Sequence, residues 1–189
     1  MKKRLILTTL AGLSIASAPT LANESPSFNF ISANFVEYDL DGADVDGFSL
    51  HSNYELGNNL FIEADMQRIS RYDINLLTGS LGLGYAYFVH ETTAVTGSIG
   101  TGYDRLTGDS PVNESTHFSY ANVGLRSRVH KMVELGADVQ REWGGSGYNE
   151  TSYGIEARLY VQPRFSIDVG YRYVDSDLDG YSVGIAYHF

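Results

Sequence analysis

The sequence predicts an all-β fold: a closed, antiparallel, up-and-down transmembrane β-barrel of about ten strands. Apolar or aromatic residues alternate with small or polar residues through most of the chain, and a period of two is typical of strands with two unlike faces. After residue 22 no segment has the ~18 consecutive apolar residues that a transmembrane helix requires. A closed sheet is then the structure that leaves no backbone group unpaired in lipid.

Residues 1–22 have the pattern of a secretory signal peptide. Residues 2–4 are basic, an apolar run extends from Leu5 to Ala18, and Thr20-Leu21-Ala22 offers small residues for cleavage. The remaining chain, 23–189, has a length that suits one barrel domain. It contains no Cys, which excludes disulfides and thiol chemistry.

The first three strands differ in how clearly they alternate. In residues 28–40, Phe28 and Phe30 share one parity whereas Ile31 and Phe35 share the other, so the inward face of this strand stays open. The strand at 48–56 alternates clearly, and Gly57-Asn58-Asn59 then predicts a tight turn because Gly and Asn tolerate positive φ. Residues 60–67 form the third strand. If the first and third strands are misassigned, the count falls to eight.

The later strands repeat one pattern. Residues 74–87 alternate most regularly before the chain end, with small inward residues that leave room for bulky neighbours across the lumen. The following strands set outward apolar residues against small, acidic or arginine side chains inside. These strands are expected at 95–103, 116–129, 133–140, 153–161, 165–173 and 181–189.

The connections are of two lengths. Short turns at 57–59, 90–93, 130–132 and 162–164 alternate with longer, often acidic loops, apart from a short connection at 68–73. This alternation is expected for periplasmic turns and external loops. Outer loops are expected at 39–47, 104–115, 143–150 and 175–180. Aromatic residues near both strand ends predict two interfacial girdles: Tyr54, Tyr85, Tyr87, Tyr187 and Phe189 at one end, and Tyr103, Tyr171 and Tyr173 at the other.

The net charge makes nucleic acid an improbable partner. Three of the 13 Lys and Arg residues lie in 1–22, which leaves 10 basic against 23 acidic residues in the rest of the chain. A protein with such an acidic surface repels a polyanion.

The chain resembles the small OmpA-like and OmpX-like outer-membrane β-barrels of Gram-negative bacteria. The resemblance rests on the signal peptide, on repeats such as Leu81-Gly82-Leu83-Gly84-Tyr85, and on the terminal aromatic residue. It implies a monomer in the outer membrane, with lipopolysaccharide and the barrel assembly machinery as partners. In that family the closing strand is the assembly signal, which corresponds here to Tyr181, Val183, Ile185, Tyr187 and Phe189.

Ten charged residues are expected to face the lumen. Unpaired charges there would be costly, and nine of the ten basic residues after residue 22 are Arg, which suits bidentate pairing. We therefore predict an ion-pair network that connects the strands of the barrel wall and largely fills the lumen. The alternative is a narrow, gated ion path, because so small a barrel is unlike a broad porin. The ten residues are Glu63, Asp65, Arg126, Arg128, Glu134, Asp138, Glu156, Arg158, Asp168 and Arg172.

Residues 175–180 match the first half of an EF-hand loop, and 39–47 offers a looser version. Asp175, Asp177 and Asp179 are therefore candidates for weak divalent-cation binding. The twelfth position of the loop, where a bidentate acid is needed, is Ala186. We expect no established metal site and no cofactor.

His117-Phe118-Ser119 resembles the His-x-Ser of outer-membrane lipid A deacylases, in which His activates a Ser nucleophile. Here Tyr120 follows where that family has Asn, and no acid lies at a matching distance. A lipid-active hydrolase is thus the least favoured reading. We expect no catalytic residues, and a structural or surface-interaction role through acidic external loops.

Overall fold

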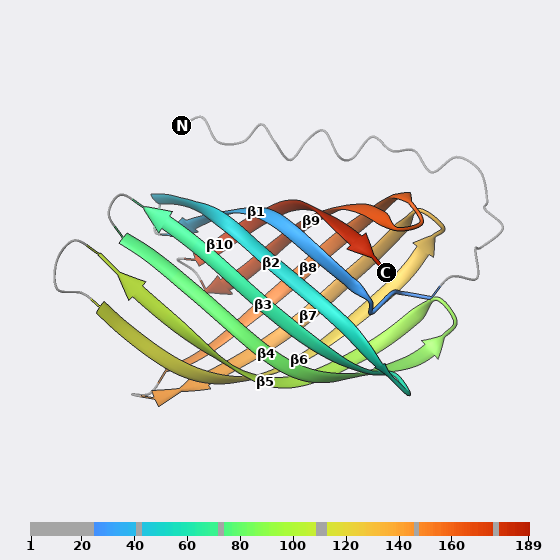
Figure 1. Cartoon of the computed structure of the whole chain (residues 1–189), viewed down its shortest axis with the longest axis horizontal. Coiled ribbons are helices and arrows are strands. Elements are labelled where there is room, and N and C mark those ends of the chain that lie inside the picture. The colour runs from blue at the N-terminus through green and yellow to red at the C-terminus, as the bar shows by residue number, and fades with distance from the viewer. Residues whose placement is uncertain (1–24, 41–42, 72–73, 109–112, 146–147, 176–177) are drawn as a thin grey trace.

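The computed structural model describes residues 25–40, 43–71, 74–108, 113–145, 148–175 and 178–189. Each strand pairs with its neighbours in sequence, and β1 pairs with β10, so the sheet closes into an antiparallel barrel (Figure 1). The prediction of ten strands rather than eight is confirmed. The strands are β1 (Phe30–Leu40), β2 (Ala43–Gly57), β3 (Leu60–Arg71), β4 (Ile74–His90), β5 (Thr93–Thr107), β6 (Asn113–His130), β7 (Val133–Gly144), β8 (Asn149–Gln162), β9 (Phe165–Asp175) and β10 (Leu178–His188).

The described residues include no helix long and apolar enough to cross a membrane. The expected signal peptide, residues 1–22, falls outside the described residues and stays a prediction.

The outer face of the barrel is apolar, as the alternation predicts. Leu81, Ile99 and Val123 are exposed at mid-strand. In a membrane, apolar side chains at such positions contact lipid instead of water. β1, whose facing the sequence left open, turns Ile31 and Phe35 outward and Phe30, Ser32 and Val36 inward. Phe28, which precedes the strand, is also buried. Aromatic residues of both predicted girdles also face outward: Tyr54, Tyr85, Tyr87, Tyr187 and Phe189, and Tyr103 and Tyr173.

The seam between β1 and β10 closes the sheet. Its register runs from Phe30 opposite His188 to Leu40 opposite Leu178, and the Phe189 amide donates to the Asn29 carbonyl at 3.2 Å. Four residues of the expected assembly signal, Tyr181, Val183, Ile185 and Tyr187, lie on the outward face of β10, and Phe189, which follows the strand, is exposed as well.

One end of the barrel, here called the turn end, has two-residue turns at 58–59, 91–92, 131–132 and 163–164. The predicted tight turn at Gly57-Asn58-Asn59 is confirmed, with φ values of 96°, 53° and 65°. Positive φ disfavours most side chains, and Gly and Asn are the residues that accept it most readily. The opposite end is here called the loop end.

The predicted outer loops are too long. β5 continues to Thr107, β6 starts at Asn113, β2 starts at Ala43, and β10 starts at Leu178. Within the expected loop at 39–47, Asp39 pairs with Asp44 across the β1–β2 ladder. The hairpins extend beyond the apolar band, where outward residues are polar, so the ladder continues while the hydrophobic alternation disappears.

Inward glycines make room for rings from neighbouring strands. A Cβ at Gly82 would lie 2.1 Å from the Tyr120 hydroxyl, and one at Gly100 would lie 2.5 Å from the Tyr120 ring. A Cβ at Gly84 would lie 2.2 Å from the Phe61 ring. The expectation that small inward residues accommodate bulky neighbours is confirmed, and these glycines determine how far the rings reach into the lumen.

Candidate functional site

The lumen is the candidate site, since it gathers the charges that the sequence places on the inward faces. All ten predicted residues lie on inward-facing strand positions, but they do not form one network. The structure divides them between a buried cluster near the turn end, here called the plug, and an open cavity toward the loop end. The plug consists of Phe28, Phe30, Arg126, Arg128, Glu134, Arg158, Tyr160, Ser166, Asp168 and His188.

Glu134 of β7 is the centre of the plug and is 1% exposed. The Arg126 guanidinium donates to one carboxylate oxygen through Nε at 2.9 Å and also through Nη2. The Tyr160 hydroxyl donates to the other oxygen at 2.9 Å, and Arg158 Nη1 lies 3.6 Å from the first. Glu134 thereby links the neighbouring strands β6, β7 and β8 on the inner face of the wall.

A second carboxylate extends the plug to the seam. Arg158 Nε donates to both oxygens of Asp168 at 3.1 Å, and Arg158 Nη2 lies 3.0 Å from Asp168 Oδ2. Ser166 Oγ donates to Asp168 at 2.8 Å and lies 3.0 Å from Nε2 of His188. These contacts link β8 and β9 to β10, the last strand.

Aromatic rings cover the guanidinium groups of the plug. Phe30 is 2% exposed, and the centre of its ring lies 4.2 Å from Arg158 Cζ and 5.4 Å from Arg126 Cζ. Phe28 lies 4.7 Å from Arg126 Cζ, and Arg128 stacks over Tyr160 at 3.6 Å. Such contacts stabilise cations that are removed from water.

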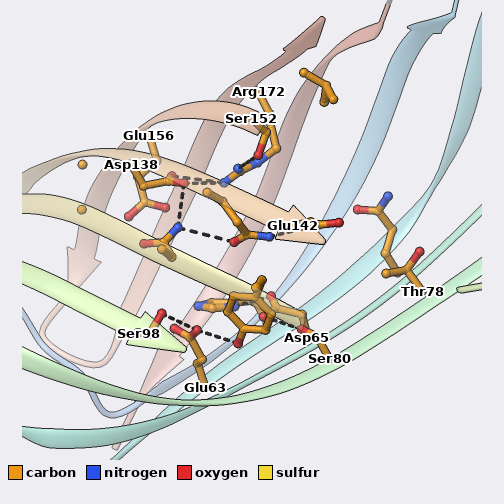
Figure 2. Close-up of a pocket in the computed structure, with 18 of the residues that line it drawn as sticks. Glu63, Asp65, Thr78, Ser80, Ser98, Asp138, Glu142, Ser152, Glu156 and Arg172 are labelled. Carbon is orange, nitrogen blue, oxygen red and sulfur yellow. Dashed lines mark hydrogen bonds and ion pairs between the residues drawn. The ribbon is translucent and has the colours of Figure 1, made fainter. Parts of the chain in front are cut away.

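The cavity occupies the other part of the lumen and has a volume of about 490 Å³. Carboxylates of β3 and of β7 and β8 lie on facing walls, as Figure 2 shows for Glu63 and Asp65 opposite Asp138 and Glu156. The lining includes seven acidic residues, which are Glu63, Asp65, Asp104, Asp138, Glu142, Glu150 and Glu156.

Asp65 and Asp138 each have a basic partner. His51 Nδ1 lies 2.5 Å from Asp65 Oδ1, and Arg172 Nη2 lies 3.1 Å from both oxygens of Asp138. Gly154 permits the second pair, because a Cβ there would lie 2.3 Å from an Asp138 oxygen.

Other carboxylates of the cavity have only neutral donors. Glu63 accepts from Ser98 and Tyr120, both at 2.7 Å. Asp104 accepts from Thr78 at 2.6 Å.

Glu142, near the loop end, also has only neutral donors. It accepts from Gln140 at 2.7 Å and from Tyr148 at 2.9 Å. Burial and the Glu142 carboxylate raise the pKa of Tyr148, so this phenol stays protonated and donates.

Plug and cavity therefore differ in charge sign. In the plug, three arginines face two carboxylates, Glu134 and Asp168. The cavity is lined by seven carboxylates and by the basic residues His51, Arg172 and Arg126. Arg126 is already paired with Glu134 of the plug. The lumen is thus basic near the turn end and strongly acidic toward the loop end.

Sequence reasoning missed part of this lining. Asp104 was placed in an external loop, which is wrong: β5 extends past it and turns it inward. The hydrogen bond from Tyr160 to Glu134 follows only from the register of β7 and β8, which the sequence does not reveal. If the alternation is continued two residues past the expected strand ends at 103 and 140, Asp104 and Glu142 fall on the inward face.

The remaining sequence candidates form no site among the described residues. No group of three or more His, Cys, Asp or Glu side chains there converges to hold a metal ion. Asp175 ends β9 and Asp179 lies in β10, whereas Asp177 falls outside the described residues, so the divalent-cation hypothesis stays a hypothesis. His117 and Ser119 lie on the outward face of β6.

Comparison with known families agrees with this geometry. The family model described as "Outer membrane protein beta-barrel domain" matches residues 8–189. The chain belongs to that family. This outer membrane protein β-barrel is accordingly a small barrel of the bacterial outer membrane, as the resemblance implied. In such barrels short turns face the periplasm and longer loops face outward, so we expect the cavity to open toward the cell exterior.

Two solved structures with a TM-score above 0.5 share the fold of this outer membrane protein β-barrel. An outer membrane channel from Pseudomonas putida F1 is similar with a TM-score of 0.55 and 11% identity, over 92% of this chain and 100% of that one. The NanC porin gives a TM-score of 0.51 and 8% identity, over 84% and 100%. The N-terminal β-barrel domain of Pseudomonas aeruginosa OprF has a lower TM-score of 0.47 and 12% sequence identity, over 85% of this chain and 98% of that one. No curated protein sequence matches the chain.

Proposed function

We propose that this outer-membrane barrel is not an enzyme and that its lumen is closed to ions, so that it acts as a structural element and through its external end. The observation that supports this most directly is the burial of the plug. Glu134, Ser166 and Phe30 are the largest side chains that are almost fully buried, and all three lie inside the barrel. A path for hydrated ions would require water at these atoms.

The charges oppose conduction as well. A cation that enters the acidic cavity next meets the plug, in which arginines outnumber carboxylates. An anion is excluded earlier, by the cavity. Because the two segments lie in series and have opposite sign, an ion of either sign meets a barrier.

Outward arginines support lipopolysaccharide as a partner. Arg68 and Arg105 are exposed and lie at the same level of the wall, since both pair with Leu77 of the strand between them. Arg141 is exposed on the outward face of β7. Guanidinium groups recognise phosphate by bidentate hydrogen bonds. The apolar outward face of β10 likewise supports recognition by the barrel assembly machinery during insertion.

Conductance in a planar lipid bilayer tests the closed lumen. The refolded protein is expected to give no single-channel steps. The double variant Glu134→Ala/Arg158→Ala, which removes the two central side chains of the plug, is expected to conduct and shows that the assay detects an open barrel. Steps of comparable size from the unmodified protein would overturn the proposal.

The second candidate is a narrow, cation-selective channel whose plug opens. The acidic cavity is the observation that favours it, and proteins that share the fold are named as a porin and a channel. In the same experiment it predicts cation-selective steps from the unmodified protein, and loss of selectivity when Glu63 and Glu156 are replaced by Gln.

A further inference from the structure

We propose that the cavity is a binding site for an organic polyamine, that is, a chain of methylene groups that carries two or more protonated amines. This inference rests on the proposed closed lumen, because the plug makes the cavity a blind pocket rather than a passage. A volume of about 490 Å³ is in the range of small-molecule sites.

The acceptors of the cavity exceed its donors. Glu63, Asp104 and Glu142 are held by neutral hydroxyl or amide groups. Glu156 accepts no hydrogen bond among the described residues, and its charge interacts with Arg158 and His51 without direct contact. Carboxylates in a confined pocket are stabilised when a cation enters. The ligand that this lining favours is therefore a cation with several N–H donors.

A buried acceptor without a partner independently points to a donor ligand. Asn53 lines the cavity and is 5% exposed, and its Oδ1 atom has no hydrogen-bond partner in the described structure. Asn53 pairs with Glu63 across the β2–β3 ladder, and both residues face inward. A buried carbonyl oxygen left unsatisfied is costly, and an ammonium group bound beside Glu63 is the kind of donor that Asn53 Oδ1 lacks.

The positions of the carboxylates favour a chain over a single ion. Glu63 lies on β3 and Glu156 on β8, strands that are opposite in the ring of ten. Asp104 and Glu142 lie nearer the loop end, close to the last residues of β5 and β7. No three acidic or histidine side chains among the described residues converge on one point. Separated amines can reach separated carboxylates, whereas one metal ion cannot.

Titration calorimetry of the refolded full chain in detergent micelles, with spermidine as the probe, tests this site. Saturable binding is expected that weakens as salt is raised. Glu63→Gln and Glu156→Gln are each expected to lower the affinity about tenfold or more, since each removes a charge-assisted hydrogen bond. The matched control is Glu91→Gln, the same charge change in an exposed turn at the other end, which is expected to leave the affinity unchanged.

Three results would overturn the inference: no saturable binding, an equal loss of affinity in Glu91→Gln, or binding of magnesium ions alone as tight as that of spermidine. Butylamine, with one amine, is expected to bind at least about tenfold more weakly than spermidine. Conductance measured without spermidine reports on the closed lumen alone, so failure of the site and failure of the proposed function are distinguishable.

Discussion

Glu134→Gln is the substitution that tests the plug most directly. The change keeps the shape of the side chain but removes the charge that Arg126 and Arg158 share. The new amide nitrogen is a donor, and it would face the guanidinium donors of these arginines. Loss of one partner from a buried ion pair typically costs about 3–5 kcal/mol. Arg158 keeps Asp168, so we expect the lower end, about 3 kcal/mol.

Urea unfolding of the barrel in lipid vesicles measures this loss. Trp143 is the only tryptophan of the chain and is 46% exposed on the outward face of β7, so its emission reports whether the wall contacts lipid. The midpoint is expected to fall with an unchanged slope. High salt is expected to change the difference little, because buried pairs are poorly screened.

Glu142→Gln is the matched control, since Glu142 is only half-buried and accepts from neutral donors. It is expected to cost at most about 1 kcal/mol. Adding Arg126→Met to Glu134→Gln is expected to restore part of the lost stability, because it removes an uncompensated charge. The reasoning is refuted if Glu134→Gln falls within 1 kcal/mol of the unmodified protein, or if Glu142→Gln loses as much.

Three further substitutions test the wall itself by the same unfolding measurement. Gly82→Ala places a Cβ 2.1 Å from the Tyr120 hydroxyl and should lower the free energy of unfolding by about 1–3 kcal/mol. Gly97→Ala is the control and should cost little, because the atom nearest to its Cβ would be 4.0 Å away. Equal losses in the two variants would contradict this account. Asn59→Ala, at φ 65°, should cost about 1 kcal/mol, whereas Asn59→Gly should not destabilise the turn. Leu83→Arg, on the lipid face at the middle of β4, should cost about 2–4 kcal/mol, and a neutral result would argue against a lipid-facing wall.

The faces of the strands could be predicted because lipid imposes the alternation on the sequence. Where the wall meets lipid, as from Leu81 to Tyr87, every outward residue must be apolar and inward residues are free to be small or polar. β1 was ambiguous for a physical reason. Phe28 and Phe30 are apolar because they cover arginines inside the barrel, so both of its faces are apolar.

The limits of the loops and the division of the lumen could not be predicted in this way. Outside the apolar band neither face of a hairpin must be apolar, so Asp44 and Asp46 looked like loop residues although they extend β2. Inward charges were identified from parity alone. Which acid pairs with which arginine depends on register between strands, and a one-residue change would separate Glu134 from Arg158.

The plug also has a consequence for how the barrel forms. Phe30 belongs to the first strand, whereas its neighbours Arg158 and His188 belong to β8 and to the last strand. The ion pairs and ring contacts around it therefore cannot be complete until β1 and β10 meet. Closure of the seam and desolvation of the central arginines become one cooperative step, so an incompletely closed sheet lacks the interactions that stabilise the finished barrel. Once formed, the seam is held by its backbone ladder and from inside the lumen, and we expect it to resist lateral opening in the membrane.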